Sequence, residues 1–275
     1  MPKTIVITGS SDGIGAAAAR QLAGRGHTVV VVGRSPDKTA AVAREIGGDH
    51  FVADFARFAD VRALAAALGA KYPRIDVLAN NAGGVFGDPG KTVDGFEKTV
   101  QVNHLSPFLL TNLLMDTLLA ARASVIQTSS AGARMVRSLD VDDLDNDRNF
   151  SAGKAYSASK LENILFTREL HTRYHDRGLS AAAFHPGGVA TNFADDSTAW
   201  LRPLYRNPVI SRLLTSADKA ARQLVWLAEG QPGVDWQSGQ YYEKYRPRKT
   251  RPLPDQDHVT RRLWDRSAEV TGLGG

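Results

Sequence analysis

The sequence predicts a single doubly wound α/β domain, residues 1–275, in which helices cover both faces of a central parallel sheet. Three observations carry this prediction. Short apolar segments alternate with longer helical segments along the chain. A glycine-rich turn joins the first apolar segment to the first helical one. The 275 residues are 43% hydrophobic and 23% charged, which is enough for one large core.

The alternation is clearest near the N-terminus. Residues 4–8 are short and apolar, and residues 13–25 are rich in alanine, as in a helix. Residues 28–32 are apolar throughout, which is typical of a strand buried on both faces. Residues 36–46 predict a helix that has proline in its first turn. Further elements are expected in this order: strand 50–53, helix 58–68, strand 75–79, helix 106–119, strand 124–127, helix 154–174, strand 179–184 and helix 216–229.

Two stretches interrupt the alternation. Residues 136–152 are polar and rich in aspartate, and residues 193–215 mix aromatic and aliphatic side chains with charged ones. Loops after the carboxyl ends of parallel strands bind ligands in doubly wound proteins, so we expect the second stretch to cover a substrate. A helical hairpin that buries its own side chains is the alternative.

Composition excludes several classes of protein. The chain has no cysteine, which rules out disulfides, thiol catalysis and cysteine-ligated metals. No apolar run approaches the ~20 residues of a membrane span. The first residues enter a strand without a signal-peptide pattern, so we expect a cytoplasmic location.

The formal net charge is +5, which raises the question of an anionic partner. A basic protein can bind nucleic acid, but arginine-rich helix faces are more often simply solvated. The densest basic stretch, residues 244–251, is interrupted by Pro247 and is best interpreted as a solvated loop. We therefore expect no nucleic-acid partner.

Gly9, Gly13 and Gly15 lie between the first predicted strand and the first predicted helix. Residues without side chains permit a tight turn and let the backbone approach a pyrophosphate, which the free N–H groups of a helix N-terminus attract. The spacing differs from the commoner G-x-G-x-x-G, and a ligand-free glycine turn is the alternative. We predict a dinucleotide cradle that also includes Ser11, Asp12 and Ile14.

Arg34 follows the second predicted strand, where the adenosine ribose of a dinucleotide is expected. An acidic residue there would bind both ribose hydroxyls and repel a 2′-phosphate, whereas an arginine pairs with that phosphate. Asp37 is nearby, but it follows Pro36 and is expected in the first helical turn. We therefore favour NADP(H) over NAD(H), with a surface arginine as the alternative.

Tyr156 and Lys160 lie one helical turn apart, a spacing that is common on any helix. Four further motifs accompany them, namely Thr8-Gly9-x-x-x-Gly13-x-Gly15, Asn80-Asn81-Ala82-Gly83, Ser129-Ser130 and His185-Pro186-Gly187-Gly188-Val189-Ala190-Thr191. Together with Asn103, this combination resembles the short-chain dehydrogenase/reductase family over essentially the whole chain. The resemblance implies a Rossmann-like fold and reversible hydride transfer.

The resemblance implies four catalytic residues. Tyr156 would be the general acid in reduction and the general base in oxidation, and Lys160 would favour its phenolate and bind the nicotinamide ribose. Ser130 would hold the substrate carbonyl oxygen; it is chosen over Ser129 because the family uses the second serine of such a pair. Asn103 would hold a water that links Lys160 to solvent, although it could merely cap the next helix. No metal is expected.

The same matching gives further cofactor positions. Asp54 and Phe55 would meet the adenine, and Asn81, Ala82 and Gly83 would line the adenosine side. Contacts with the nicotinamide end are expected from a last group, namely Pro186, Gly187, Val189 and Thr191. His185 is interpreted as structural.

The long segment between Ser130 and Tyr156 resembles the branch of the family that contains retinol dehydrogenases and related carbonyl reductases. This branch supports NADP(H), but Asp12 stands where many NADP-using members have a basic residue. We predict reversible hydride transfer to a ketone or aldehyde, or from a secondary alcohol. The alternatives are a non-catalytic NADP(H) sensor or scaffold, and a double-bond reductase or epimerase.

The expected partner is a small carbonyl or alcohol substrate that is bulky and apolar. Phe193, Trp200 and Leu204 are its predicted contacts. Family members are often dimers or tetramers, so a homo-oligomer is one expectation that no residue pattern decides.

Overall fold

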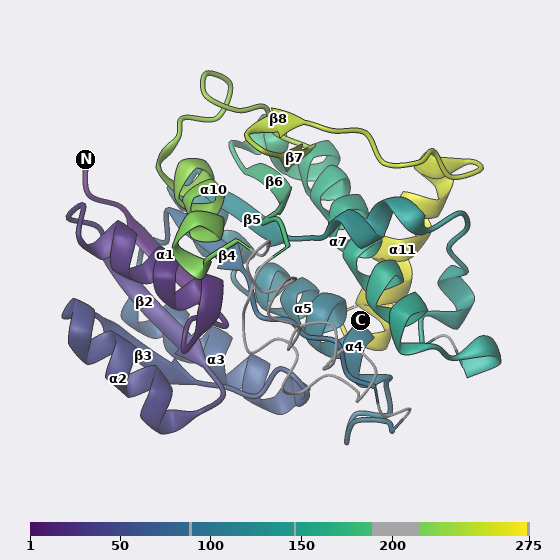
Figure 1. Ribbon diagram of the computed structural model, residues 1–275, viewed down its shortest axis with the longest axis horizontal. Coiled ribbons are helices and arrows are strands. Elements are labelled where there is room, and N and C mark those ends of the chain that lie inside the picture. Colours follow the sequence, from purple (N-terminus) through teal and green to yellow (C-terminus); the bar gives the residue numbers. More distant parts are fainter. Residues whose placement is uncertain (88–89, 146, 189–214, 274–275) are drawn as a thin grey trace.

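A computed structural model describes residues 1–87, 90–145, 147–188 and 215–273 of the chain. One mixed sheet forms its centre (Figure 1). In the described part it has eight strands in the spatial order β3 (Asp49–Val52), β2 (Thr28–Gly33), β1 (Thr4–Thr8), β4 (Val77–Asn80), β5 (Ser124–Thr128), β6 (Ser180–His185), β7 (Gln240–Glu243) and β8 (Arg246–Pro247). Strands β1 to β7 are parallel, and β8 runs antiparallel to β7.

Helices cover both faces of this sheet (Figure 1). One face packs against α1 (Gly13–Ala23), α2 (Pro36–Ile46) and α10 (Ala217–Glu229). The other packs against α3 (Phe58–Lys71), α5 (Ser106–Leu113), α7 (Ala152–Tyr174) and α11 (Gln256–Val270). Shorter helical segments are α4 (Lys98–Val100), η1 (Gln101–Leu105), α6 (Met115–Ala121), η2 (Ala131–Met135), η3 (Val141–Asp143), η4 (Asp147–Asn149) and η5 (His175–Arg177). The predicted doubly wound α/β class is therefore confirmed.

The burial pattern of β1 shows why both faces need cover. Ile5 and Ile7 belong to the core under α1 and α10, whereas Val6 between them belongs to the core under α3, α5 and α7. Successive side chains of a strand point to opposite faces, so a run that is apolar at every position must be buried on both sides.

The strand order reverses between β1 and β4, because the chain builds β2 and β3 outward from β1 and then returns to its other side. The loops after β1 and β4 diverge at this point and leave a crevice at the carboxyl ends of the strands. The predicted glycine cradle and the Asn80-Asn81 motif both lie there.

The predicted helix at residues 106–119 is wrong as a single element. The chain is already helical from Lys98, and a π-helical turn, η1, precedes α5. Leu114 then leaves the helical region, with φ −95° and ψ 5°, and separates α5 from α6. The extra residue in the turn of η1 changes the direction in which Asn103 projects.

The sequence prediction also omitted β7, β8 and α11. The pattern of α11 was nevertheless present, because its buried residues Thr260, Leu263, Trp264 and Ser267 recur at helical spacing. No helix in the described residues is long and apolar enough to cross a membrane.

Helix α11 stabilises α7, the helix that carries Tyr156 and Lys160. The Trp264 ring lies 5.0 Å from the Phe108 ring and 5.6 Å from the Phe166 ring, centroid to centroid. It is 8% exposed. A single aromatic side chain of α11 thus bridges α5 and α7.

We expect Trp264→Ala to lower the free energy of unfolding by about 3 to 5 kcal/mol, because it leaves a cavity between three helices. Urea unfolding followed by circular dichroism measures the change. Arg261→Ala, at an exposed position of the same helix, is the matched control. A loss in Trp264→Ala no larger than that of the control would contradict the packing role.

Candidate active site

A cleft of about 1450 Å³ runs along the carboxyl ends of the strands. Residues from both predicted motifs line it. Of the predicted site residues, those in the wall are Gly9, Ser11, Asp12, Gly13, Ile14, Arg34, Asp54, Phe55, Asn81, Ala82, Gly83, Ser130, Tyr156, Lys160, Pro186 and Gly187. Gly15 and Asn103 are not part of the wall, and both lie behind it.

The glycine loop is built by backbone contacts that exclude side chains. Gly9 has φ +64°, and a Cβ there would lie 2.7 Å from Ala82 Cα. At Gly15 a Cβ would lie 2.4 Å from Gly9 O, so helix α1 can approach the loop this closely only without a side chain. The loop is therefore a cradle that a Cβ would fill, which fits a pyrophosphate at the α1 N-terminus. Asp12 caps that helix by accepting a hydrogen bond from Gly13 N at 2.7 Å.

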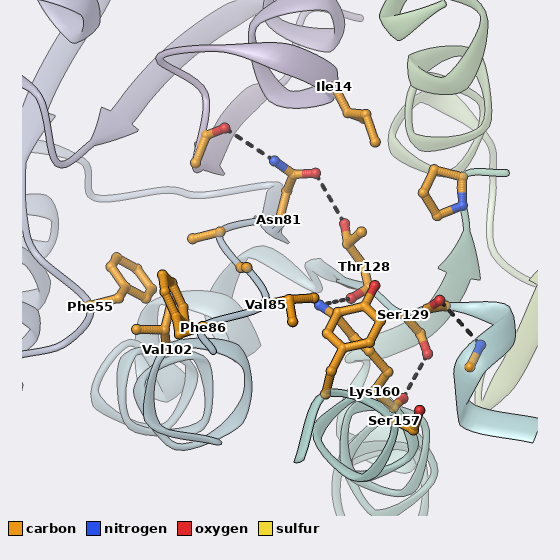
Figure 2. A pocket seen from close by; sticks show the side chains of 18 of the residues that line it. Ile14, Phe55, Asn81, Val85, Phe86, Val102, Thr128, Ser129, Ser157 and Lys160 are labelled. Atoms are coloured by element: carbon orange, nitrogen blue, oxygen red, sulfur yellow. Dashed lines mark hydrogen bonds between the residues drawn. The ribbon is translucent and has the colours of Figure 1, made fainter. Parts of the chain in front are cut away.

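Three polar residues tie the ends of β1, β4 and β5 together. Thr8 Oγ1 accepts hydrogen bonds from the backbone N–H groups of Asn81 and Ala82, each at 3.0 Å. The Asn81 amide donates to Thr8 O and Gly9 O, and its Oδ1 accepts from Thr128 Oγ1 at 3.2 Å. Figure 2 shows Asn81 between the glycine loop and Thr128. The glycine loop is thus tied through Asn81 to Thr128 at the end of β5.

Lys160 lies beneath the cleft and is only 3% exposed. Its Nζ donates to Thr128 O at 3.1 Å (Figure 2). The same Nζ lies 5.7 Å from the centroid of the Tyr156 ring. Burial lowers the pKa of Lys160 to about 8. At pH 7 this side chain still carries its proton, so a positive charge faces the partly exposed Tyr156.

Asn103 fastens the loop after β4 to helix α7. Its Oδ1 accepts from Gly84 N at 2.8 Å, and its Nδ2 donates to Gly84 O and to Ser159 Oγ, each at 3.0 Å. A Cβ on Gly83 would lie 2.8 Å from Asn103 Oδ1 and 3.0 Å from Lys160 Nζ. Both amide donors are therefore used, and one lone pair of Oδ1 is the side-chain site left for a water.

The two serines after β5 have different surroundings. The hydroxyl of Ser129 is buried and donates to Lys160 O at 2.6 Å. Ser130 is partly exposed beside Tyr156 in the cleft wall, and its Oγ accepts from Gly132 N at 3.2 Å. That hydroxyl still has its own proton to donate, which favours Ser130 over Ser129 as the substrate contact.

The sequence analysis missed a cluster behind Tyr156. Glu243, at the end of β7, accepts a hydrogen bond from Tyr241 at 2.8 Å and pairs with Arg134 of η2 at 3.4 Å. Burial and the bond to Glu243 raise the pKa of Tyr241, and charge on Tyr156 raises it further. His185, next to Glu243 on the adjacent strand, has a pKa lowered by burial. The ion pair between Arg134 and Glu243 connects η2 to the end of β7.

Lys38 is another residue of the cleft wall that the sequence analysis missed. It lines the cleft with Arg34, and its Nζ lies 3.8 Å from Asp12 Oδ2. The sequence signal for Lys38 was its position about one helical turn after Arg34, where α2 begins. Phe55, Phe86 and Val102 gather at one end of the cleft (Figure 2).

Five predicted site residues lie outside the described part of the chain. These are Val189, Thr191, Phe193, Trp200 and Leu204, and nearly all of the predicted substrate-covering segment, residues 193–215, lies there too.

Comparisons with known proteins give one consistent family. A family model described as short chain dehydrogenase matches residues 3–202. A protein from Streptomyces sp. (strain C5), provisionally named daunorubicin C-13 ketoreductase DnrU, is 40% identical, with 98% of this chain and 93% of the relative covered. Human retinol dehydrogenase 13 is 35% identical, with 98% and 85% covered. A solved structure of an uncharacterised protein from Mycobacterium paratuberculosis is similar with a TM-score of 0.75 at 32% identity, with 98% and 93% covered.

The buried Lys160 makes stability depend on pH. Its folded pKa lies below its ordinary value, so between about pH 8 and 10.5 the unfolded chain binds more protons. We therefore expect Lys160→Met to raise the free energy of unfolding at pH 7 by about 1 to 3 kcal/mol, because it removes a desolvated charge. The gain should shrink as pH rises from 8 to 10.5.

Urea unfolding of the cofactor-free protein at pH 7, 9 and 10 measures this change. Lys219→Met, at an exposed position of α10, should show no such pH-linked gain. A gain in Lys160→Met that stays constant across these pH values would contradict the buried ammonium.

Proposed function

The chain belongs to the short chain dehydrogenase family, and we propose that it transfers a hydride between NADP(H) and a bulky ketone or aldehyde, or the corresponding alcohol. Membership makes it an oxidoreductase that acts on carbonyl or alcohol substrates with a nicotinamide cofactor. The observation that carries the proposal is the buried Lys160 held below Tyr156 in the wall of the cleft.

The cofactor would be held mainly by backbone. Gly9, Ser11 and Gly13 line the cradle at the N-terminus of α1, where N–H groups and the helix dipole attract the pyrophosphate. Asp54, Phe55 and Asn81 would serve the adenosine half. When bound, the cofactor supplies or accepts the hydride.

Tyr156 would handle the proton that accompanies hydride transfer. A free phenol has a pKa near ~10, which makes it a poor base at neutral pH. The ammonium of Lys160 favours the phenolate, since an opposite charge about 6 Å or less away stabilises the ionised form. Because Lys160 is buried, salt screens its charge much less than that of a surface lysine.

Ser130 would donate its hydroxyl proton to the substrate oxygen and hold it near Tyr156. Donors fixed in advance stabilise the charge that develops on such an oxygen without reorganising. Gly132 N holds Ser130 Oγ, so the hydroxyl is oriented before the substrate arrives. Asn103 would act by holding the loop at Gly84 and helix α7 at Ser159 in fixed positions near Lys160.

Two cations support NADP(H). Arg34 and Lys38 both line the cleft after β2, and a 2′-phosphate beside them would gain charge-assisted hydrogen bonds. Asp37, the acid nearest in sequence, lies in the first turn of α2 and is exposed. Asp12 near Lys38 offsets part of this positive charge.

The substrate end of the cleft supports a bulky apolar molecule. Met135 and Val136 line the wall there, and Met135 is 76% exposed. Relatives are named for daunorubicin and for retinol, which favours a large carbonyl or alcohol compound for this chain too.

We expect Tyr156→Phe to lower turnover of a panel of ketones and aldehydes with NADPH by at least about a hundredfold, since it removes the proton donor. Absorbance of the reduced nicotinamide follows turnover, and fluorescence titration with NADPH follows binding, which should stay nearly intact. Tyr245→Phe, outside the cleft wall, is the control. Unchanged turnover in Tyr156→Phe would contradict the mechanism. Tight binding of NADPH by the unaltered protein without turnover of any carbonyl compound would favour the alternative of a non-catalytic sensor.

We expect Arg34→Asp to reduce the ratio of kcat/KM for NADPH to that for NADH by roughly tenfold to a hundredfold, because a charged hydrogen bond is lost and a repulsive carboxylate is gained. Steady-state kinetics with both cofactors measures the ratio. Arg222→Asp on α10 controls for the change in net charge. An unaltered ratio in Arg34→Asp would refute this role of Arg34.

A further inference from the structure

Charged side chains are unevenly distributed along the cleft. Among the described residues of its wall, the acidic ones are Asp12 and Asp54, which lie beside the glycine loop and at the end of β3. Arg137 and Lys154 line the other end, close in sequence to Met135 and Tyr156. The end of the cleft where the carbonyl group is expected is therefore positive.

Arg137 and Lys154 are attached to the segments that handle the proton. Arg137 comes two residues after η2, which begins directly after Ser130. Lys154 lies in the first turn of α7, two residues before Tyr156. Both side chains are exposed and long, so they can meet a molecule whose carbonyl lies at Ser130 and Tyr156.

Most of the neighbouring acids are already paired with other cations; in the described residues Asp143 is the exception, and its carboxylate accepts from the backbone N–H groups of Asp147 and Arg148. In the aspartate-rich stretch before α7 the partners are Asp140 with Arg148 at 2.8 Å, Asp142 with Arg262 at 2.5 Å, and Asp145 and Asp147 with Lys91 at 3.1 and 2.6 Å. Arg134 is paired with Glu243. Within the described ranges, neither Arg137 nor Lys154 forms an ion pair or a side-chain hydrogen bond.

The expected cofactor charges do not account for these two cations. The pyrophosphate and the 2′-phosphate are assigned to the glycine loop and to Arg34 with Lys38, which lie after β1 and β2. Arg137 and Lys154 lie after β5 and at the start of α7. A substrate that carries an anionic group would supply a counter-charge at their end of the cleft.

We propose that the substrate is an apolar ketone or aldehyde that carries a carboxylate, which Arg137 and Lys154 bind. Its apolar body would cover the exposed Met135 and Val136, because burying such surface is favourable. A guanidinium binds a carboxylate through two parallel N–H donors, and the ammonium adds a second positive charge. This inference rests on the proposed function and specifies its substrate class.

Matched pairs of substrates test the inference. The pairs are para-formylbenzoate with its methyl ester, and the corresponding biphenyl aldehyde acid with its methyl ester, each assayed with NADPH. The unaltered enzyme should prefer each acid to its ester in kcat/KM by about tenfold, mainly through KM, as expected for a partly enclosed charged contact. Raising the salt concentration should reduce this preference.

Arg137→Gln and Lys154→Gln should each reduce the preference for the acid roughly fivefold, and the double variant should abolish it while turnover of the esters is kept. Arg222→Gln and Lys219→Gln on α10 remove the same charges outside the cleft wall and should leave the preference unchanged. Equal or better use of the esters by the unaltered enzyme, or a preference that survives in the double variant, would overturn the inference.

Binding of an unreactive pair separates this inference from the proposed function. Calorimetry with para-tert-butylbenzoate and its methyl ester, in the presence of NADP, should give tighter binding of the acid, which the double variant loses. Such binding without turnover of any aldehyde would support the anion site and reject the proposed reaction. Equal binding of acid and ester would reject the anion site even if both aldehydes are reduced.

Discussion

The hydrogen bond from Lys160 Nζ to Thr128 O is the contact on which the site depends. A buried ammonium is costly unless polar atoms surround it. Among the described residues it donates to Thr128 O, which also accepts a hydrogen bond from the Asn163 amide. The hydroxyl of the same threonine donates to Asn81, whose amide reaches Thr8 O and Gly9 O. One residue at the end of β5 therefore fixes Lys160 and the glycine cradle relative to each other.

This arrangement makes the layer under α5 and α7 unusually polar for a protein core. Glu162, two positions after Lys160 in the sequence, is fully buried. Burial raises its pKa to about 8, and the charges of Glu97 and Asp145 contribute to the rise. The shift favours the neutral carboxylic acid. Gln127 on β5 is also fully buried. Such groups cost stability, and the aromatic packing of Trp264 on α5 and α7 offsets part of that cost.

The sequence could predict the features that follow from the periodicity of apolar residues and from backbone geometry. Buried parallel strands are apolar at every position, and the glycines of the cradle are required by contacts that a Cβ would fill, so both leave a signal in the chain. Asn103 was found as a residue type, but its contacts with Gly84 and Ser159 depend on the π-helical turn of η1, which no pattern announced. Glu243 lies on a four-residue strand whose register beside His185 is set by tertiary pairing. To predict that Lys38 lines the cleft, one must know the direction of α2 relative to the glycine loop, and that direction is set by tertiary packing.

The two ends of the cleft are therefore constrained to different degrees. At the cofactor end the glycine loop packs through its main chain, and a side chain at Gly9, at Gly83 or at Gly15 behind the wall would collide with neighbouring atoms. At the other end the wall includes three long, exposed side chains: Met135 at the end of η2, Arg137 two residues after it, and Lys154 in the first turn of α7. They can change without displacing the sheet. Family membership therefore determines the reaction more firmly than the substrate. The identity of the substrate has to be inferred from the apolar and charged side chains of that end. Those include the exposed Met135 and two cations, Arg137 and Lys154, which form no ion pair within the described residues.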